Sequence, residues 1–220
     1  MAVILSGKEL SEKLTQEQKQ RVAELKAQGI HPGLAVVLVG EDPASTIYVR
    51  NKGIACETIG IHSETIRLPE DASQEQLEDT IQRLNEDKKI SGILVQLPLP
   101  KHLDEEAALA KILPEKDVDG FHLMNAGKLF TGQEGVIPCT PKGILYMLKE
   151  AGIELKGKEA VIIGRSNIVG KPAAMLLLQE HCTVTICHSR TQNLKEHARR
   201  ADILVAAIGK PRFVTADMVK

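Results

Sequence analysis

One stretch of the sequence indicates the fold class: AVIIGRSNIVGKP at residues 160–172. It begins with an apolar run typical of a buried strand, passes through Gly164, and leads into an apolar helical segment. Gly164 can take the tight turn after the strand, the small Ser166 lets the backbone approach a phosphate, and Gly170 permits close contact between helix and sheet. The start of the helix would then face the pyrophosphate of a dinucleotide. The stretch therefore predicts the first strand, turn and helix of a Rossmann-type domain.

The loop departs from the usual GxGxxG pattern, because Ser166 replaces the middle glycine and the last glycine comes one position late. A glycine turn that holds no ligand is the alternative for such a pattern taken alone. The second strand adds context, since it ends in CHSR at residues 187–190 and not in the acid that binds the ribose of NAD. Ser189 and the guanidinium of Arg165 or Arg190 would bind a 2′-phosphate, which a carboxylate would repel. The sequence thus predicts NADP as the cofactor.

Outside this stretch, apolar strands alternate with amphipathic helices along both halves of the chain. The clearest strand is the apolar run at residues 34–39, flanked by glycine, which is typical of a strand buried on both faces of a parallel sheet. Ser73 and Gln76 form a capping box that starts a helix. The other predicted elements are helices at 6–28, 45–59, 141–151, 168–180 and near Leu194, and strands at 63–68, 91–97, 159–163, 183–187 and 202–206. This alternation is typical of doubly wound α/β domains.

The length of 220 residues exceeds that of a typical single domain of about 100 to 150 residues. The periodicity fails between residues 113 and 140, where glycines and a proline predict a long loop of the kind that carries function. We therefore expect a first domain at residues 1–118, a cleft loop and interdomain connection at 119–140, and a nucleotide-binding domain at 141–220. The predicted fold class is α/β, with two doubly wound α/β domains flanking a cleft. The second domain holds one βαβαβ half before Lys220, so we expect it to be incomplete.

Composition excludes several classes of function. Hydrophobic residues make up 43% and charged residues 26%, as in an ordinary globular protein, and the net charge of -1 gives no broad footprint for nucleic acid. The apolar runs are far shorter than the about 20 residues that span a bilayer, and residues 1–9 become charged before a signal region develops. The cysteines are scattered without a CxxC pair, so neither a zinc site nor a disulfide framework is indicated. We expect a cytoplasmic protein without nucleic-acid, membrane or metal partners.

A second group of residues points to catalysis. The segment YVRNK at residues 48–52 places Tyr48 and Lys52 on one helix face. A pair of this kind is more often part of a solvated helix face than of an active site, but two further segments of the sequence favour an active site. The third strand ends in VQLPLP at residues 95–100, and Gln96 would emerge at the strand ends, where parallel α/β domains bind ligands. The segment KDVDG at residues 116–120 adds carboxylates that could accept paired hydrogen bonds from an amino-substituted heterocycle.

The segments YVRNK, VQLPLP, DVDG and GRS resemble, in order and spacing, the motifs of the bifunctional methylenetetrahydrofolate dehydrogenase/methenyltetrahydrofolate cyclohydrolase (FolD) family. The resemblance covers essentially the whole chain, and it implies that residues 1–118 are the folate-binding catalytic domain and residues 141–220 the NADP-binding domain. It implies oxidation of 5,10-methylenetetrahydrofolate with NADP, hydrolysis of the methenyl product to 10-formyltetrahydrofolate, and a homodimer. Family members usually continue through another strand, a Pro-Gly-Gly-Val-Gly-Pro segment and a returning helix. The resemblance therefore implies that this chain lacks its C-terminal segment.

The resemblance also implies roles for particular residues. Lys52 would be the catalytic lysine, which activates water or carries the proton, while Gln96 orients its amine and Tyr48 shapes the pocket. Asp119 would hold the pterin ring. The full set of implied substrate contacts is Tyr48, Lys52, Val95, Gln96, Leu97 and Asp119. The positions that match the family's NADP site are Gly164, Arg165, Ser166 and Ser189.

Three alternatives remain at this point. A two-domain dehydrogenase of the shikimate type also pairs a catalytic lysine with an NADP domain, but its substrate is a carboxylate without a pterin. A nonenzymatic NADP-binding regulator would keep the fold without turnover. A methyltransferase-like nucleotide domain predicts an acid after the second strand, and the sequence His188-Ser189-Arg190 argues against it. His188 itself fits a packed or solvated residue better than a catalyst, because nothing nearby completes a constellation.

Overall fold

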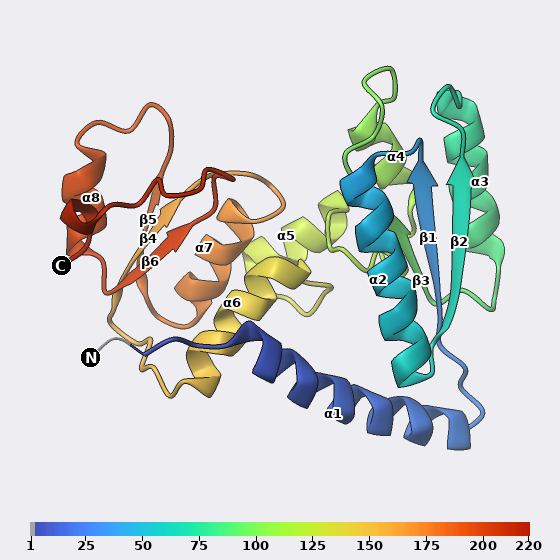
Figure 1. Ribbon diagram of the computed structural model, residues 1–220, viewed down its shortest axis with the longest axis horizontal. Coiled ribbons are helices and arrows are strands. Elements are labelled where there is room, and N and C mark those ends of the chain that lie inside the picture. The colour runs from blue at the N-terminus through green and yellow to red at the C-terminus, as the bar shows by residue number, and fades with distance from the viewer. Residues whose placement is uncertain (1–2) are drawn as a thin grey trace. The chain divides into compact units, whose positions relative to one another are not determined.

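The computed structural model describes residues 3–220, so Met1 and Ala2 of the predicted first domain lie outside the described residues. The chain forms two compact units, the first ending at Val118 and the second beginning at Asp119. Each unit contains a parallel sheet with helices on both of its faces (Figure 1). The predicted α/β class, with a doubly wound sheet in each half of the chain, is confirmed.

The first unit is built around the strands β2, β1 and β3, which pair in that order and run parallel. Residue Val36 of the central strand pairs with Thr65 on one side and with Leu94 on the other. The elements of this unit are α1 (Gly7–Ala27), β1 (Gly33–Val39), α2 (Pro43–Ile59), β2 (His62–Leu68), α3 (Gln74–Glu86), β3 (Gly92–Val95) and α4 (Glu105–Lys111). All of them except α4 were predicted from the sequence to within a few residues.

Both faces of β1 are buried, which explains its uninterrupted apolar sequence. Ala35, Val37 and Val39 pack on one side with residues of α3, β3 and α4. Val36 and Leu38 pack on the other side with residues of α2 and β3. Successive side chains of a strand point to opposite faces, so a strand covered on both sides needs apolar residues at every position. The third helix begins at the predicted capping box, in which the side chains of both members bond to main-chain amides.

The second unit repeats this plan around the strands β5, β4 and β6, which pair in that order and run parallel. On one face of β4, Ala160 and Ile162 pack with residues of α6 and α7, and on the other Val161 and Ile163 pack with residues of α8. The elements are α5 (Leu123–Thr131), α6 (Cys139–Glu150), β4 (Glu159–Ile163), α7 (Gly170–Gln179), β5 (Thr183–Cys187), α8 (Leu194–Arg200), β6 (Ile203–Ala206) and the 3-10 helix η1 (Ala216–Met218).

The segment between residues 113 and 140 is not the irregular loop that the sequence predicts, because α5 lies within it. His122 starts this helix by accepting a hydrogen bond from the amide of Met124 at 3.1 Å, and Gly132 ends it in the left-handed conformation. Leu129 is buried, and its carbonyl accepts a hydrogen bond from Gln179 of α7 at 2.7 Å. Burial against α7 thus outweighs the cost of a glycine inside the helix, about 1 kcal/mol.

Within residues 3–220, no helix is both long and apolar enough to cross a membrane. The same part of the chain contains no group of three or more His, Cys, Asp or Glu side chains placed to hold a metal ion. Cys139 is exposed, whereas Cys56, Cys182 and Cys187 are buried.

Candidate active site

The helix α2 carries two of the predicted site residues, and its start is fixed by a cap. The Asp42 carboxylate accepts a hydrogen bond from the amide of Ser45 at 2.7 Å, and this bond holds the pKa of Asp42 below its usual range. A proline follows at the first helical position, where its missing amide costs nothing. The helix ends at Gly60, which has a φ of 85°. Tyr48 and Lys52 therefore lie on successive turns of a helix that is well defined at both ends.

Lys52 and Gln96 form the central pair of the site. Lys52 Nζ donates a hydrogen bond to Gln96 Oε1 over 2.8 Å, and both side chains are half-buried. Gln96 directly follows β3, and its main-chain amide donates to the carbonyl of Val37 at 2.9 Å. Its side-chain Nε2 donates to the carbonyl of Leu97 at 2.7 Å. Because the amide nitrogen is held by Leu97, the amide oxygen is the atom presented to the lysine.

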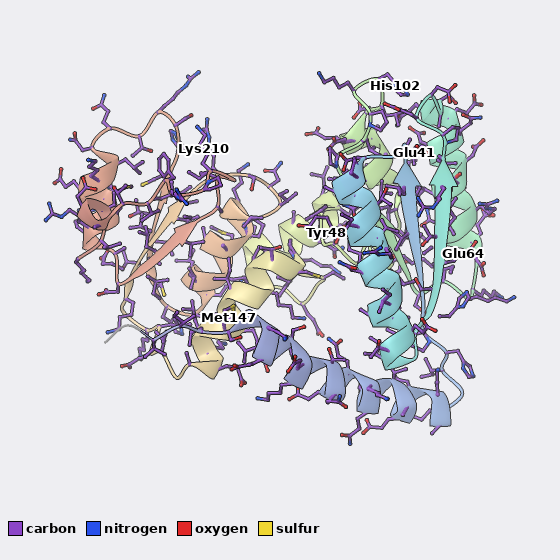
Figure 2. All side chains as sticks on the ribbon, in the orientation of Figure 1. Glu41, Tyr48, Glu64, His102, Met147 and Lys210 are labelled. Atoms are coloured by element: carbon purple, nitrogen blue, oxygen red, sulfur yellow. The ribbon has the colours of Figure 1, made fainter. Side chains whose placement is uncertain are left out.

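The remaining predicted substrate residues around β3 differ in exposure. Tyr48 projects from α2 one turn before Lys52 and is 62% exposed (Figure 2). Leu97 is half-buried and packs against the core of the first unit. Val95 is 1% exposed and belongs to that core, so it fixes the end of β3 by packing. The structure thus brings Lys52 and Gln96 into contact and leaves an accessible tyrosine on the same helix.

The two carboxylates of the KDVDG segment have different environments. Asp117 is 1% exposed and pairs with Ile93 in an isolated parallel bridge, so it extends the sheet and is not open to a ligand. Asp119 is half-buried and is the first residue of the second unit. The expectation that both carboxylates of the segment face a heterocycle is therefore wrong for Asp117. Sequence reasoning also missed Lys116, whose ammonium donates to three main-chain carbonyls.

The loop between β4 and α7 has the geometry that its glycines predict. Gly164 has a φ of 132°, a conformation that side chains disfavour. A Cβ on Gly170 would clash with the carbonyl group of Gly164, so the start of α7 can lie this close to the end of β4 only because residue 170 is glycine. Ser166 Oγ accepts hydrogen bonds from the amides of Val169 at 3.2 Å and Gly170 at 3.3 Å. Arg165 and Ser166 are exposed on the rim of this turn.

The end of β5 lies beside this loop, since the amide of Gly164 donates to the carbonyl of Cys187 at 2.8 Å. Burial raises the pKa of the Cys187 thiol, so this side chain is an inert part of the core. His188 Nδ1 accepts a hydrogen bond from the amide of Arg190 at 3.1 Å, which gives it a structural role in the turn. Ser189 and Arg190 are exposed. A serine and an arginine, without a carboxylate, are therefore available at the position where dinucleotide domains meet the adenosine ribose.

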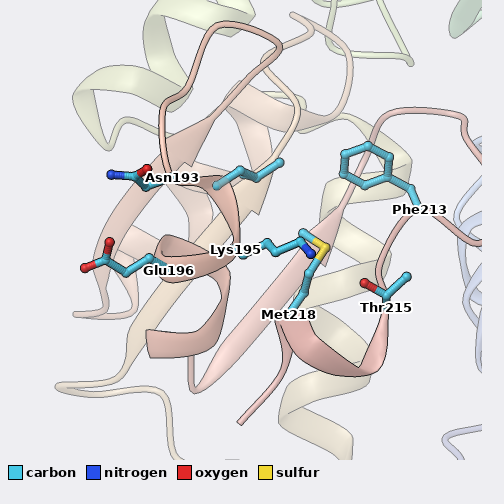
Figure 3. A pocket seen from close by; sticks show the side chains of 7 residues that line it. Asn193, Lys195, Glu196, Phe213, Thr215 and Met218 are labelled. Atoms are coloured by element: carbon cyan, nitrogen blue, oxygen red, sulfur yellow. The ribbon is translucent and has the colours of Figure 1, made fainter.

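A cavity of about 650 Å³ lies elsewhere in the second unit, between the start of α8 and the segment that contains η1 (Figure 3). Phe213 and Met218 form part of its apolar lining, and Lys195 is paired there with Asp217 at 2.5 Å. Its lining residues are Asn193, Leu194, Lys195, Glu196, Phe213, Thr215 and Met218. None of the residues predicted for folate or NADP is among them. We therefore assign the site from the hydrogen bonds around Lys52 and Gly164 and not from this cavity.

Comparison with known families matches both halves of the chain. The family model described as tetrahydrofolate dehydrogenase/cyclohydrolase, catalytic domain, matches residues 5–119. The model described as tetrahydrofolate dehydrogenase/cyclohydrolase, NAD(P)-binding domain, matches residues 138–220. The first range contains Lys52, Gln96 and Asp119, and the second contains the loop between β4 and α7.

Individual proteins agree with these matches. The bifunctional protein FolD of Bacillus cytotoxicus is 56% identical over 220 residues, which cover 100% of this chain and 77% of that protein. The crystal structure of FolD from Campylobacter jejuni has a TM-score of 0.97 at 47% identity, covering 99% of this chain and 78% of that one. The structure of the Trypanosoma brucei enzyme, complexed with NADP and an inhibitor, has a TM-score of 0.95 at 37% identity and covers 100% of this chain and 76% of that one.

Proposed function

Because this chain belongs to the tetrahydrofolate dehydrogenase/cyclohydrolase family, we infer its two reactions from that membership and propose which residues carry them. It oxidises 5,10-methylenetetrahydrofolate to 5,10-methenyltetrahydrofolate with NADP, and it hydrolyses the methenyl compound to 10-formyltetrahydrofolate. Both are reactions of one-carbon metabolism. Family membership sets aside the shikimate-type dehydrogenase, the nonenzymatic regulator and the methyltransferase-like domain as readings of this sequence.

We propose that the loop between β4 and α7 holds the cofactor. NADP, when bound, accepts the hydride that leaves the methylene carbon of the folate. The close approach of Gly170 to Gly164 leaves the start of α7 free of side chains that would occupy the place of a phosphate. Gly164, Arg165 and Ser166 line this turn, and Ser189 follows the neighbouring strand. A serine hydroxyl and a guanidinium are suited to a 2′-phosphate, which supports NADP and not NAD at this site.

The hydrogen bond between Lys52 and Gln96 is the observation that supports the hydrolytic site. In the reaction, the oxygen of water bonds to the methenyl carbon, the bond from that carbon to N5 breaks, one water proton ends on N5 and the other leaves to solvent. We propose that Lys52 takes the proton from the attacking water and delivers it to N5. Gln96 holds the amine in place through Oε1, and Tyr48 borders the same helix face. Positioned acid/base groups of this kind contribute about 10² to 10⁴ in rate.

We propose that the folate ring is bound by residues on either side of this pair. Leu97 follows Gln96 and is partly open, and Tyr48 offers a ring and a hydroxyl. Asp119 would accept two hydrogen bonds from the amino-substituted pterin through one carboxylate. Val95 acts indirectly in this proposal, because it is buried and fixes the end of β3 from which Gln96 emerges.

A homodimer and a cytoplasmic location are also part of the proposal. The membership of the chain in the tetrahydrofolate dehydrogenase/cyclohydrolase family supports both. Light scattering coupled to gel filtration of the full-length protein measures the first, with a mass of two chains as the expected result. Fractionation of cells that express the protein measures the second, with activity expected in the cytoplasmic fraction.

A spectrophotometric assay of the full-length protein tests the two reactions together. We expect NADP reduction with methylenetetrahydrofolate, and loss of methenyl absorbance when methenyltetrahydrofolate is supplied alone. Parallel reactions contain NAD in place of NADP, or shikimate in place of the folate. Cofactor reduction with shikimate and none with the folate would contradict the proposal, and so would NADP binding without turnover of either folate.

A further inference from the structure

Lys116 lies three residues before Asp119, and its side chain is hydrogen-bonded to the end of α3. Its ammonium donates to the carbonyls of Leu84 at 3.0 Å, Asn85 at 2.7 Å and Asp87 at 2.9 Å. The final carbonyls of a helix have no partner within the helix, and they form the negative end of its dipole. An ammonium has three donors, so these bonds use all of them. Lys116 therefore has a fixed position that depends on where α3 ends.

The main chain around Lys116 is held just as closely on its other side. The Lys116 carbonyl accepts a hydrogen bond from the amide of Ile93 at 2.7 Å, and Asp117 pairs with Ile93 as a parallel bridge. Val118 packs directly on Gly92, where any Cβ would clash with its side chain. Residues 116–118 thus form an added rung on the open edge of β3. The same strand ends next to Gln96, so one strand carries the residue that contacts Lys52 and the segment that leads to Asp119.

Asn85 of α3 fixes the chain that precedes this segment. Its side chain is 8% exposed, and it donates to the carbonyl of Lys111 at 2.7 Å and accepts from the amide of Leu113 at 3.1 Å. The amide of Lys116 in turn donates to the carbonyl of Leu113 at 2.8 Å. The end of α3 and the edge of β3 therefore both fix the path of the chain from α4 to Val118.

We propose that Lys116 is a positioning residue for folate binding. It sets the register of residues 116–118 on β3 and thereby the point at which the chain presents Asp119, three residues later. This inference rests on the proposed contact between Asp119 and the pterin. A displacement of about 1 Å at a positioning group can cost about 10²-fold in efficiency, so losing the three bonds to α3 should weaken folate binding. The bonds made by Lys116 lie within the first unit, whereas the cofactor loop follows β4 in the second, so NADP binding should not respond.

The test compares Lys116→Met with Lys88→Met in the full-length protein. Methionine keeps the length and packing of lysine and removes its donors, and Lys88 is an exposed lysine in the turn after α3. We expect Lys116→Met to raise the folate KM about tenfold, while kcat and the NADP KM change by less than about twofold. Lys116→Arg, which retains charged donors, should recover most of the loss. Lys88→Met should match the parent in all three parameters.

A double-mutant cycle with Asp119→Ala separates positioning from a general structural role. If Lys116 acts through Asp119, adding Lys116→Met to Asp119→Ala should raise the folate KM little further. The inference would be overturned if the effects of the two substitutions on the folate KM were fully additive, or if active Lys116→Met had an unchanged folate KM. Neither result would contradict the two reactions of the parent. A parent that turns over neither folate would instead overturn the proposed function on which it rests. Should Lys116→Met fail to fold, Lys116→Gln, with one neutral donor group, is measured in its place, and the same outcomes decide.

Discussion

Gln96 Oε1 accepts a hydrogen bond from Lys52 Nζ at 2.8 Å, although the two residues are 44 positions apart in the sequence. The contact arises because α2 follows β1 and Gln96 follows β3, and these strands are neighbours in the sheet. The amide nitrogen of Gln96 is engaged by the carbonyl of Leu97, so the acceptor faces the lysine without a competing orientation. Several expected outcomes depend on this arrangement.

Replacement of Lys52 by methionine should abolish hydrolysis of methenyltetrahydrofolate. The apolar side chain preserves the packing and removes the proton carrier, so we expect a fall of about 10² to 10⁴ in the hydrolytic rate. Dehydrogenase activity should fall less, since hydride transfer depends mainly on how the folate and nicotinamide are positioned. Stopped assays of both reactions measure the separation. Lys19→Met, at an exposed position of α1, is the control. Parental hydrolysis by folded Lys52→Met would show that Lys52 is an ordinary surface residue of α2.

Replacement of Gln96 by glutamate should shift the pH profile of hydrolysis to higher pH. A carboxylate beside the Lys52 amine favours its charged form, which cannot accept the proton of water. The fraction of active enzyme at neutral pH should therefore drop, and raising the pH should restore part of the rate. Gln96→Leu, which adds no charge, should lower the rate without moving the profile. Equal profiles for Gln96→Glu and the parent would argue against contact between the two side chains in the working enzyme.

Cofactor selectivity should depend on Arg165 and Ser189. The double substitution Arg165→Ala with Ser189→Ala removes a guanidinium and a hydroxyl that we assign to the 2′-phosphate. Hydrogen bonds to charged groups contribute about 1.5 to 3 kcal/mol, so the ratio of kcat/KM for NADP over NAD should fall about tenfold or more. Arg199→Ala, at an exposed position of α8, is the control. A parent that uses NAD and NADP with equal efficiency would remove the basis of this assignment.

Replacement of Gly170 by alanine should destabilise the second unit and weaken NADP binding. The new methyl group would clash with the carbonyl of Gly164, and overpacking of this kind costs about 1 to 3 kcal/mol. Chemical denaturation measures the change in unfolding free energy, and a cofactor titration measures binding. Gly143→Ala is the matched control, because a Cβ there meets open space and alanine favours the helix by about 0.5 to 1 kcal/mol. A neutral effect of Gly170→Ala would mean that the loop relaxes freely.

Acid should weaken the second unit through Asp217. Hydrogen bonds from Lys195 and Thr215 lower the pKa of this carboxyl from 3.8 to about 2. A lowered pKa means that ionised Asp217 stabilises the fold at pH values above 3.8, and that this contribution is lost as the pH falls toward 2. Asp217→Asn should therefore lower the melting temperature near neutral pH, and its difference from the parent should shrink on acidification. Exposed Asp71→Asn is the comparison. A difference that grows in acid would contradict the assignment.

The strands β1, β3 and β4 were predictable because burial on both faces leaves a continuous apolar run in the sequence. The predicted ranges 159–163 and 183–187 coincide with β4 and β5. The prediction that Gln96 emerges at the end of a strand followed from the same logic, and the structure places it one residue after β3. The helices α4 and α5 and the 3-10 helix η1 were missed. The helix α4 has seven residues, and α5 contains Gly127 and is bracketed by further glycines, a pattern that favours a loop.

The contacts of Lys116 were not predictable for a different reason. Its partners are main-chain carbonyls of α3, and any residue in those positions offers the same acceptor. Hydrophobic periodicity and motif spacing depend on side chains, so neither predicts a hydrogen bond to a main-chain carbonyl. The same holds for His188, where a main-chain amide occupies the ring nitrogen. In both turns, hydrogen bonds with main-chain groups fix the position of the side chain, and the residue types alone do not reveal these bonds.

The central place of β1 in the first sheet also sets an order for synthesis of the chain. Neither neighbour of β1 exists until later residues leave the ribosome, first β2 and then β3, which ends at Val95. A nascent chain that stops short of Val95 therefore exposes one long edge of β1 together with the apolar residues of its two faces. Closure by Lys116 comes last, about 20 residues further on. Chaperone demand during translation should thus be concentrated at chain lengths between completion of β1 and emergence of Lys116.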